Sequence, residues 1–129
     1  MDDITAPPSQ VVEGMSASLT RRVGDEAVQA FAEATGDTNP LHLDAEIAAA
    51  SIFGARVAHG MLSAGLISAV LGTHLPGPGT IYLAQTLRFK HPIDLGDTVT
   101  ARLTVTRVDE ARGECELDAQ VTNQEGRIV

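Results

Sequence analysis

The later part of the chain alternates apolar and polar residues, which is the spacing of strands with one buried face. Three such runs cover residues 81–89, 99–105 and 115–121. Turn-forming residues at 94–97 and 111–113 join them as a meander, so the sequence predicts an antiparallel sheet with one wetted side. Residues 15–23 show the same alternation near the start of the chain, and 127–129 begin a further strand.

The earlier part of the chain repeats its apolar positions at helical spacing. Helices are predicted at 25–35, closed by Gly36, and from Asp44 to about Ile52. A third, at 60–72, is apolar on every side, so other elements must enclose it. If the sheet wraps around this helix, the apolar face of the sheet and the apolar surface of the helix bury each other, which predicts an α+β fold.

The length of 129 residues fits a single domain. Residues 1–14 are predicted to be an irregular N-terminal arm, and residues 15–129 the folded domain. Such a sheet has an open edge strand that a second copy could cover, which favours a homodimer.

Charge and composition exclude several classes of partner. The formal net charge of -8 disfavours binding to nucleic acid. The most apolar stretch, residues 61–71, is about half of what a bilayer crossing needs, and the N-terminus lacks the pattern of a secretory signal. A lone Cys115 offers no internal disulfide, so we expect a cytoplasmic protein that binds no membrane.

Asp37 and His42 stand five residues apart in a loop rich in turn formers. A carboxylate and an imidazole at this spacing can act on one water molecule as a general acid–base pair. The competing interpretation is that Asp37 caps a turn and His42 packs at the edge of a loop.

Gly60 and Gln85 are further candidates. The amide of Gly60 begins the apolar helix, where it can stabilise a developing enolate or serve only a capping turn. Gln85 lies on the apolar face of the strand predicted at 81–89, where its amide faces a substrate or bonds to backbone groups. The four histidines show no metal-ligand spacing, and no phosphate-binding loop occurs, so no metal and no nucleotide cofactor are predicted.

Three segments resemble the MaoC-like hydratases, and more narrowly the R-specific enoyl-CoA hydratases that supply monomers for polyhydroxyalkanoate synthesis. They are residues 31–42, which contain Gly-Asp-x-Asn-Pro-x-His, His59-Gly60-Met61-Leu62, and residues 82–90. The resemblance implies a hot-dog fold and a homodimer. It also implies reversible syn hydration of a trans-2-enoyl-CoA to the (R)-3-hydroxyacyl-CoA.

The same resemblance assigns roles to single residues. Asp37 and His42 would hold and activate water, and the Gly60 amide would bind the thioester carbonyl of an acyl-CoA substrate. Three residues would contribute to substrate binding: Asn39, His59 and Gln85. The alternatives are a 3-hydroxyacyl dehydratase that acts on acyl carrier protein, a non-catalytic acyl-thioester binding module and, less favoured, a thioesterase. Members of the family continue beyond the last predicted turn, so the strand begun at residue 127 is expected to be cut short.

Overall fold

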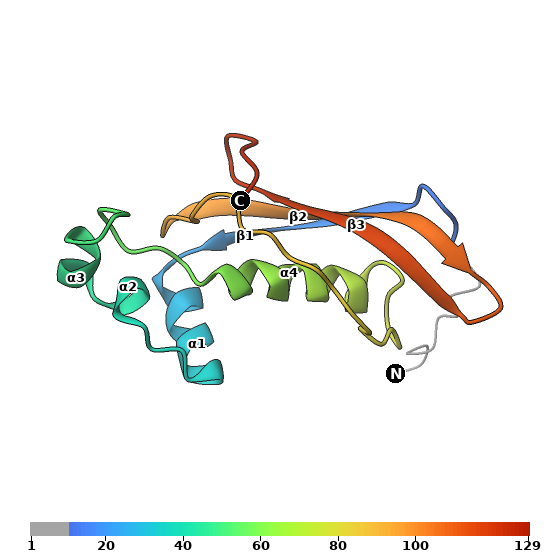
Figure 1. The fold of residues 1–129 in the computed structure, drawn as a ribbon, viewed down its shortest axis with the longest axis horizontal. Helices are drawn as coiled ribbons and strands as arrows, with labels where there is room; N and C mark the ends of the chain where they lie inside the picture. Colours follow the sequence, from blue (N-terminus) through green and yellow to red (C-terminus); the bar gives the residue numbers. More distant parts are fainter. Residues whose placement is uncertain (1–10) are drawn as a thin grey trace.

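A three-stranded antiparallel sheet lies along one long helix in the computed structural model, which describes residues 11–129 (Figure 1). The strands are β1 (Ser16–Val23), β2 (Asp97–Asp109) and β3 (Glu114–Thr122), in the order β1-β2-β3. Ala101 on β2 faces Leu19 of β1 on one side and Val121 of β3 on the other. The central strand therefore fixes the register of both neighbours.

Within residues 11–129, four helices accompany the sheet: α1 (Asp25–Thr35), α2 (Pro40–Leu43), α3 (Ala45–Ala49) and α4 (Gly60–Thr73). The chain leaves α1 at Gly36, whose φ of 80° is in the left-handed region and whose N–H bonds to the Ala32 carbonyl. Glycine adopts this conformation without a Cβ penalty, so the helix ends here and the chain turns into the Asp37 loop.

The core lies between α4 and the sheet. Leu62, Ile67 and Val70 of α4 belong to the same buried cluster as Val99 and Leu103 of β2. This packing confirms the predicted α+β architecture in which the sheet covers the apolar helix. The opposite side of α4 is different, because Met61, Gly65 and Ser68 are exposed in the part of the chain that the structure describes.

The prediction of a strand at 81–89 is wrong for this structure. The segment is not in a sheet, and its N–H and C=O groups make no backbone hydrogen bonds within residues 11–129. Its apolar side chains are exposed to solvent as well: Ile81 is 79% exposed and Leu83 is 69% exposed. Alternation predicts which face of a strand would be buried, but a strand also needs a partner for its backbone groups.

The other element predictions differ in detail. The helices at 25–35 and from Gly60 are confirmed, and the turn at 111–113 joins β2 to β3. The helix predicted at 44–52 is shorter, because it ends at Ala49, and the expected loop before it contains the one-turn helix α2. Residues 1–10 of the predicted arm lie outside the described residues. Val11 is buried and packs with Leu75 and Val105.

None of the helices within residues 11–129 has the length and apolar character needed to cross a bilayer.

Replacing Leu103 with alanine tests the central packing. Leu103 is 1% exposed, so Leu103→Ala should leave a cavity and lower the free energy of unfolding by about 2–5 kcal/mol. Gln120→Ala on exposed β3 surface is the matched control and should change it by less than about 0.5 kcal/mol. Urea unfolding at a fixed protein concentration measures both. Equal midpoints for Leu103→Ala and the parent would show that this side chain does not anchor the core.

Candidate active site

The one-turn helix α2 places His42. Asn39 precedes the helix and its side-chain oxygen accepts a hydrogen bond from the Leu41 N–H at 3.1 Å, while Pro40 takes the first helical position. Asparagine at the N-cap and proline at the first position are both favoured there, since each suits the unpaired start of a helix. The sequence Asn39-Pro40 thus starts a turn that carries His42 two residues later.

The His42 imidazole is held by one short hydrogen bond. Its Nδ1 lies 2.6 Å from the carbonyl oxygen of Val57. A carbonyl can only accept, so Nδ1 carries the hydrogen, and in the neutral ring the lone pair is then on Nε2. His42 therefore presents a proton acceptor away from Val57, and its ring is half-buried.

Asp37 is fixed by local bonds of the loop that follows α1. Its N–H donates to the Thr35 hydroxyl at 3.1 Å, and its Oδ1 accepts from the Asn39 N–H at 3.3 Å. The residue is exposed, so the rest of the carboxylate is available to solvent or substrate. Side-chain bonds to a backbone two residues away are the usual conformation of aspartate in turns.

His59 joins these two residues into one cluster. It is 2% exposed, its Nε2 donates to the Asp37 carbonyl at 3.0 Å, and its ring stacks on His42 with 3.9 Å between centroids. Its Nδ1 is buried without a hydrogen-bond partner among the described residues. Asp37 offers a carboxylate oxygen, and His42 and His59 each offer a ring nitrogen, such that these three atoms lie within 4.8 Å of one another. Asp37 and His42 thus lie close together, as the sequence predicted.

The N-terminus of α4 lies next to this cluster, because Gly60 directly follows His59. The Gly60 N–H donates to no acceptor within residues 11–129. A Cβ at this position would lie 3.1 Å from the ring of Phe89. Glycine therefore lets the segment that carries Phe89 approach the helix end and keeps an unpaired amide open.

Gln85 is not where the sequence predicted it. It is exposed, and its side-chain oxygen accepts a hydrogen bond from the Tyr82 hydroxyl. Together with Leu83 and Ala84 these residues line a shallow hollow separate from the histidine cluster. The inward-facing amide was predicted from a strand that the structure does not contain, so that prediction is wrong.

One charged residue near the site was missed in the sequence. The Arg56 guanidinium donates from Nε to the His42 carbonyl at 2.7 Å and from Nη2 to the Asp25 carboxylate at 2.6 Å. Its partners are 14 and 31 residues away in the chain, and no spacing pattern connects them.

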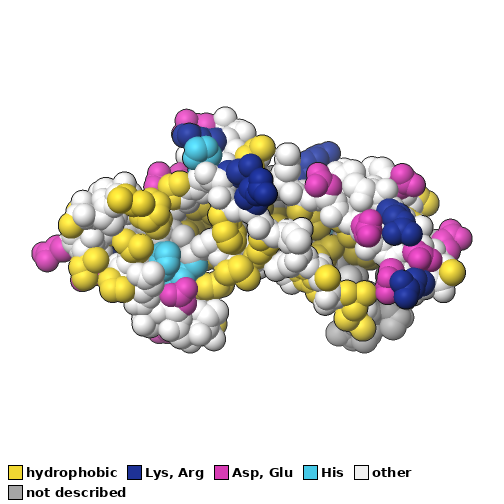
Figure 2. Space-filling view, in the orientation of Figure 1, with side chains coloured by type: hydrophobic (Ala, Val, Ile, Leu, Met, Phe, Trp, Pro, Cys, Tyr) yellow, Lys and Arg dark blue, Asp and Glu magenta, His cyan; other side chains and the backbone are white. Residues whose placement is uncertain are grey.

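The cluster of Asp37, His42 and His59 lies beside apolar surface. In Figure 2, histidine and acidic side chains lie side by side in the region where α1, α2 and the start of α4 meet, with apolar side chains around them. A second, open hollow beside α2 is lined by Thr38, Leu43 and Ile47 among others. A carboxylate and an imidazole beside apolar surface and a free helix amide suit an apolar substrate that carries a polar carbonyl group.

Comparisons with known proteins find relatives over most of the chain. A family model described as "MaoC like domain" matches residues 6–126. An (R)-specific enoyl-CoA hydratase of Rhodospirillum rubrum is 54% identical over 96 residues, which are 74% of this chain and 67% of that protein. An enzyme of the same name from Aeromonas caviae is 44% identical over 116 residues, covering 90% of this chain and 87% of its own. The chain thus spans about two thirds of the first relative's length.

A solved structure shows the same fold. It is an (R)-hydratase of A. caviae involved in PHA biosynthesis, and it superposes with a TM-score of 0.89 at 42% sequence identity. The match covers 93% of this chain and 91% of that one.

Proposed function

The chain belongs to the MaoC-like domain family and has its hot-dog fold, and on this premise we propose that it is an R-specific enoyl-CoA hydratase. The reaction is the reversible syn hydration of a trans-2-enoyl-CoA to the (R)-3-hydroxyacyl-CoA. The observation that carries the proposal is the cluster of Asp37 and His42 beside the unpaired Gly60 amide. Relatives named as (R)-specific enoyl-CoA hydratases at 44–54% identity support it.

The tautomer of His42 gives the first chemical step. Its Nε2 has a lone pair, because Nδ1 donates to Val57, so it can take a proton from water while the water oxygen bonds to C3 of the acyl chain. The exposed Asp37 carboxylate accepts the second hydrogen of the same water and orients it. Addition of oxygen at C3 moves the π electrons of the C2–C3 bond onto the thioester as an enolate.

The Gly60 amide and the protonated His42 complete the reaction. The N–H at the start of α4 stabilises the enolate oxygen, since unpaired helix N-terminal amides favour negative charge. The imidazolium then returns its proton to C2, which breaks N–H, forms C–H and restores the neutral ring. Both new bonds lie on the face of the substrate that His42 occupies, which is a syn addition.

The remaining residues implied by the resemblance keep supporting roles in the proposal. The side-chain oxygen of Asn39 caps α2, which leaves the side-chain NH₂ group for a substrate contact. Buried His59 reaches the substrate only through Asp37 and His42. Gln85 would contact substrate only if residues 81–89 joined a sheet. No cofactor enters these steps, and we place the enzyme in the cytoplasm because it has a lone, free Cys115.

The alternative substrate is the same acyl group on acyl carrier protein, with dehydration as the forward direction. The acid–base cluster serves both, since it contacts the acyl end and not the carrier. Turnover of one acyl group on coenzyme A and on carrier protein separates the two. A non-catalytic binding module would bind enoyl-CoA without turnover, and a thioesterase would release free thiol from a saturated acyl-CoA.

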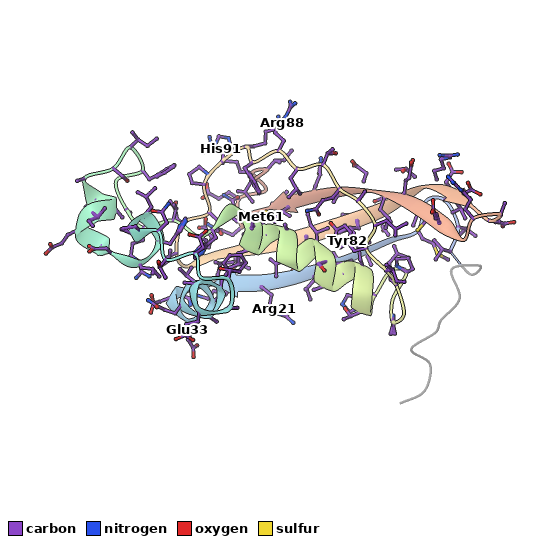
Figure 3. All side chains as sticks on the ribbon, turned by 60° about the horizontal axis from the view of Figure 1, so that its bottom comes forward. Arg21, Glu33, Met61, Tyr82, Arg88 and His91 are labelled. Carbon is purple, nitrogen blue, oxygen red and sulfur yellow. The ribbon has the colours of Figure 1, made fainter. Side chains whose placement is uncertain are left out.

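We also propose a homodimer. Met61 on α4 and Tyr82 lie on the same open side of the molecule (Figure 3), and Met61 is 50% exposed. The neighbours of Tyr82, Ile81 and Leu83, are 79% and 69% exposed, and exposed apolar surface favours association. Light scattering should therefore give twice the chain mass of 13.5 kDa. A mass of one chain that stays constant with concentration would contradict the dimer.

Removing either member of the acid–base pair should stop the chemistry while binding survives. Asp37→Asn and His42→Gln should each lower kcat by at least about 100-fold, the usual scale of general acid–base catalysis. KM should change far less, because the lost interactions act mainly in the transition state. The measurement is loss of enoyl absorbance with crotonyl-CoA.

The double variant should be little worse than either single one, because both groups act on one water. His74→Gln is the control: His74 is exposed and caps the far end of α4. Parent-level turnover in a folded Asp37→Asn or His42→Gln protein would refute the mechanism.

Gly60→Pro tests the enolate-binding amide. Proline at the first position of a helix is tolerated, and the ψ of 132° at His59 suits a residue before proline, so the fold should survive. Loss of the amide should lower kcat by about 100-fold or more. Gly60→Ala is the matched control, since it meets Phe89 in the same way but keeps the N–H. If both variants have equal kcat, the amide takes no part in turnover.

A further inference from the structure

Arg56 lies in the loop between α3 and α4, immediately before the residues that contact His42. Its side chain is 19% exposed, whereas that of its partner Asp25 is 61% exposed. The guanidinium bridges Asp25, the first residue of α1, and the carbonyl of His42 in α2. Two rigid donors of one side chain thus connect the first helix to the catalytic turn.

The His42 turn needs such support because it is short. A helix of four residues has no internal stability of its own, and the carbonyls of its last turn lack helical partners. Residues 56 and 57 make three bonds to it. The Val57 N–H donates to the Leu41 carbonyl at 3.3 Å, the Val57 carbonyl accepts from His42 Nδ1, and Arg56 Nε donates to the His42 carbonyl.

We propose that Arg56 is a positioning residue for the hydratase reaction, which holds the His42 backbone so that the imidazole Nε2 meets the catalytic water, and that Asp25 anchors Arg56. This inference rests on the proposed function. It concerns a residue that touches no substrate and acts only through His42. Asp25 is suited to the anchor because acidic groups are stabilised in the first turn of a helix.

The ionisation of Asp25 fits this role. Its hydrogen bond from Arg56 holds the pKa of the carboxyl below its usual value of 3.8. A lowered pKa means that the folded state favours the charged carboxylate, so the bridge is complete above about pH 4 and weakens only as pH falls through the lowered pKa. At neutral pH both charges of the bridge are present.

The experiment compares Arg56→Met, Arg56→Lys and Asp25→Asn on crotonyl-CoA. Arg56→Met removes both bonds at nearly constant length, and we expect kcat to fall about 10- to 100-fold, because small misplacements of a catalytic group cost this much. KM should stay within about threefold. Arg56→Lys, which can still donate to the His42 carbonyl, should recover part of kcat. Asp25→Asn should lose less than Arg56→Met, and combining the two should add nothing.

Arg112→Met, in the exposed β2–β3 turn, is the matched control for the lost charge and should leave kcat unchanged. Parent-level kcat in folded Arg56→Met would overturn the proposal, as would a kcat loss that Arg56→Lys does not relieve. If Arg56→Met fails to fold, Asp25→Asn decides by the same criterion: an unchanged kcat overturns the anchor and a lowered one supports it.

A second measurement is independent of turnover. Diethyl pyrocarbonate modifies the unprotonated ring nitrogen of histidine, and peptide mass spectrometry resolves His42 from exposed His74. Release of the turn should raise the rate at His42 several-fold relative to His74 in Arg56→Met, and equal relative rates would overturn the positioning role. A parent protein that does not hydrate crotonyl-CoA would instead refute the proposed function, and this rate would still report on Arg56.

Discussion

The packing of α4 under the sheet is the contact on which the rest of the molecule depends. Val70 of α4 and Val99 of β2 are fully buried in it, and Leu103 nearly so. Burial of this kind fixes a helix as a rigid body, since interiors are packed at crystal-like density. The start of α4 is thereby held at one place, and with it the Gly60 amide and the loop 56–59 that leads into the helix.

The loop of residues 56–59 holds the site in a fixed position relative to α4. Ala58 donates to the Ile93 carbonyl at 2.8 Å and is itself buried, so the loop is bonded to the segment that enters β2. Its neighbours on each side then hold the proposed catalytic residues: Val57 bonds the His42 ring and His59 bonds the Asp37 backbone. The core therefore supports the proposed acid–base pair through four consecutive residues, and neither Asp37 nor His42 needs to be deeply buried.

The sequence predicted the parts of this arrangement that are local. Gly36 after an amphipathic run marks a helix end, so the loop that follows could be placed together with Asp37 and His42, although the one-turn helix α2 inside it was not predicted. Arg56 could not be found this way, because its importance comes from partners that only the fold brings close. The strand predicted at 81–89 failed for a related reason. Alternation describes side chains, whereas a sheet is completed by backbone partners that alternation does not specify.

The stacked histidines bear on whether the cluster serves acid–base chemistry or an ion. His42 uses Nδ1 for Val57 and His59 uses Nε2 for Asp37, so each ring has one lone pair left, in the plane of the ring. The two ring planes are tilted by 31°, with 3.9 Å between their centroids. Zinc requires ligand atoms that converge on one point at about 2.1 Å, whereas one atom from each of these three side chains lies within 4.8 Å of the others. Water between His42 and Asp37 needs only one of these lone pairs. In the proposed mechanism the cluster serves proton transfer, and His59 is the packed surface against which the His42 ring lies.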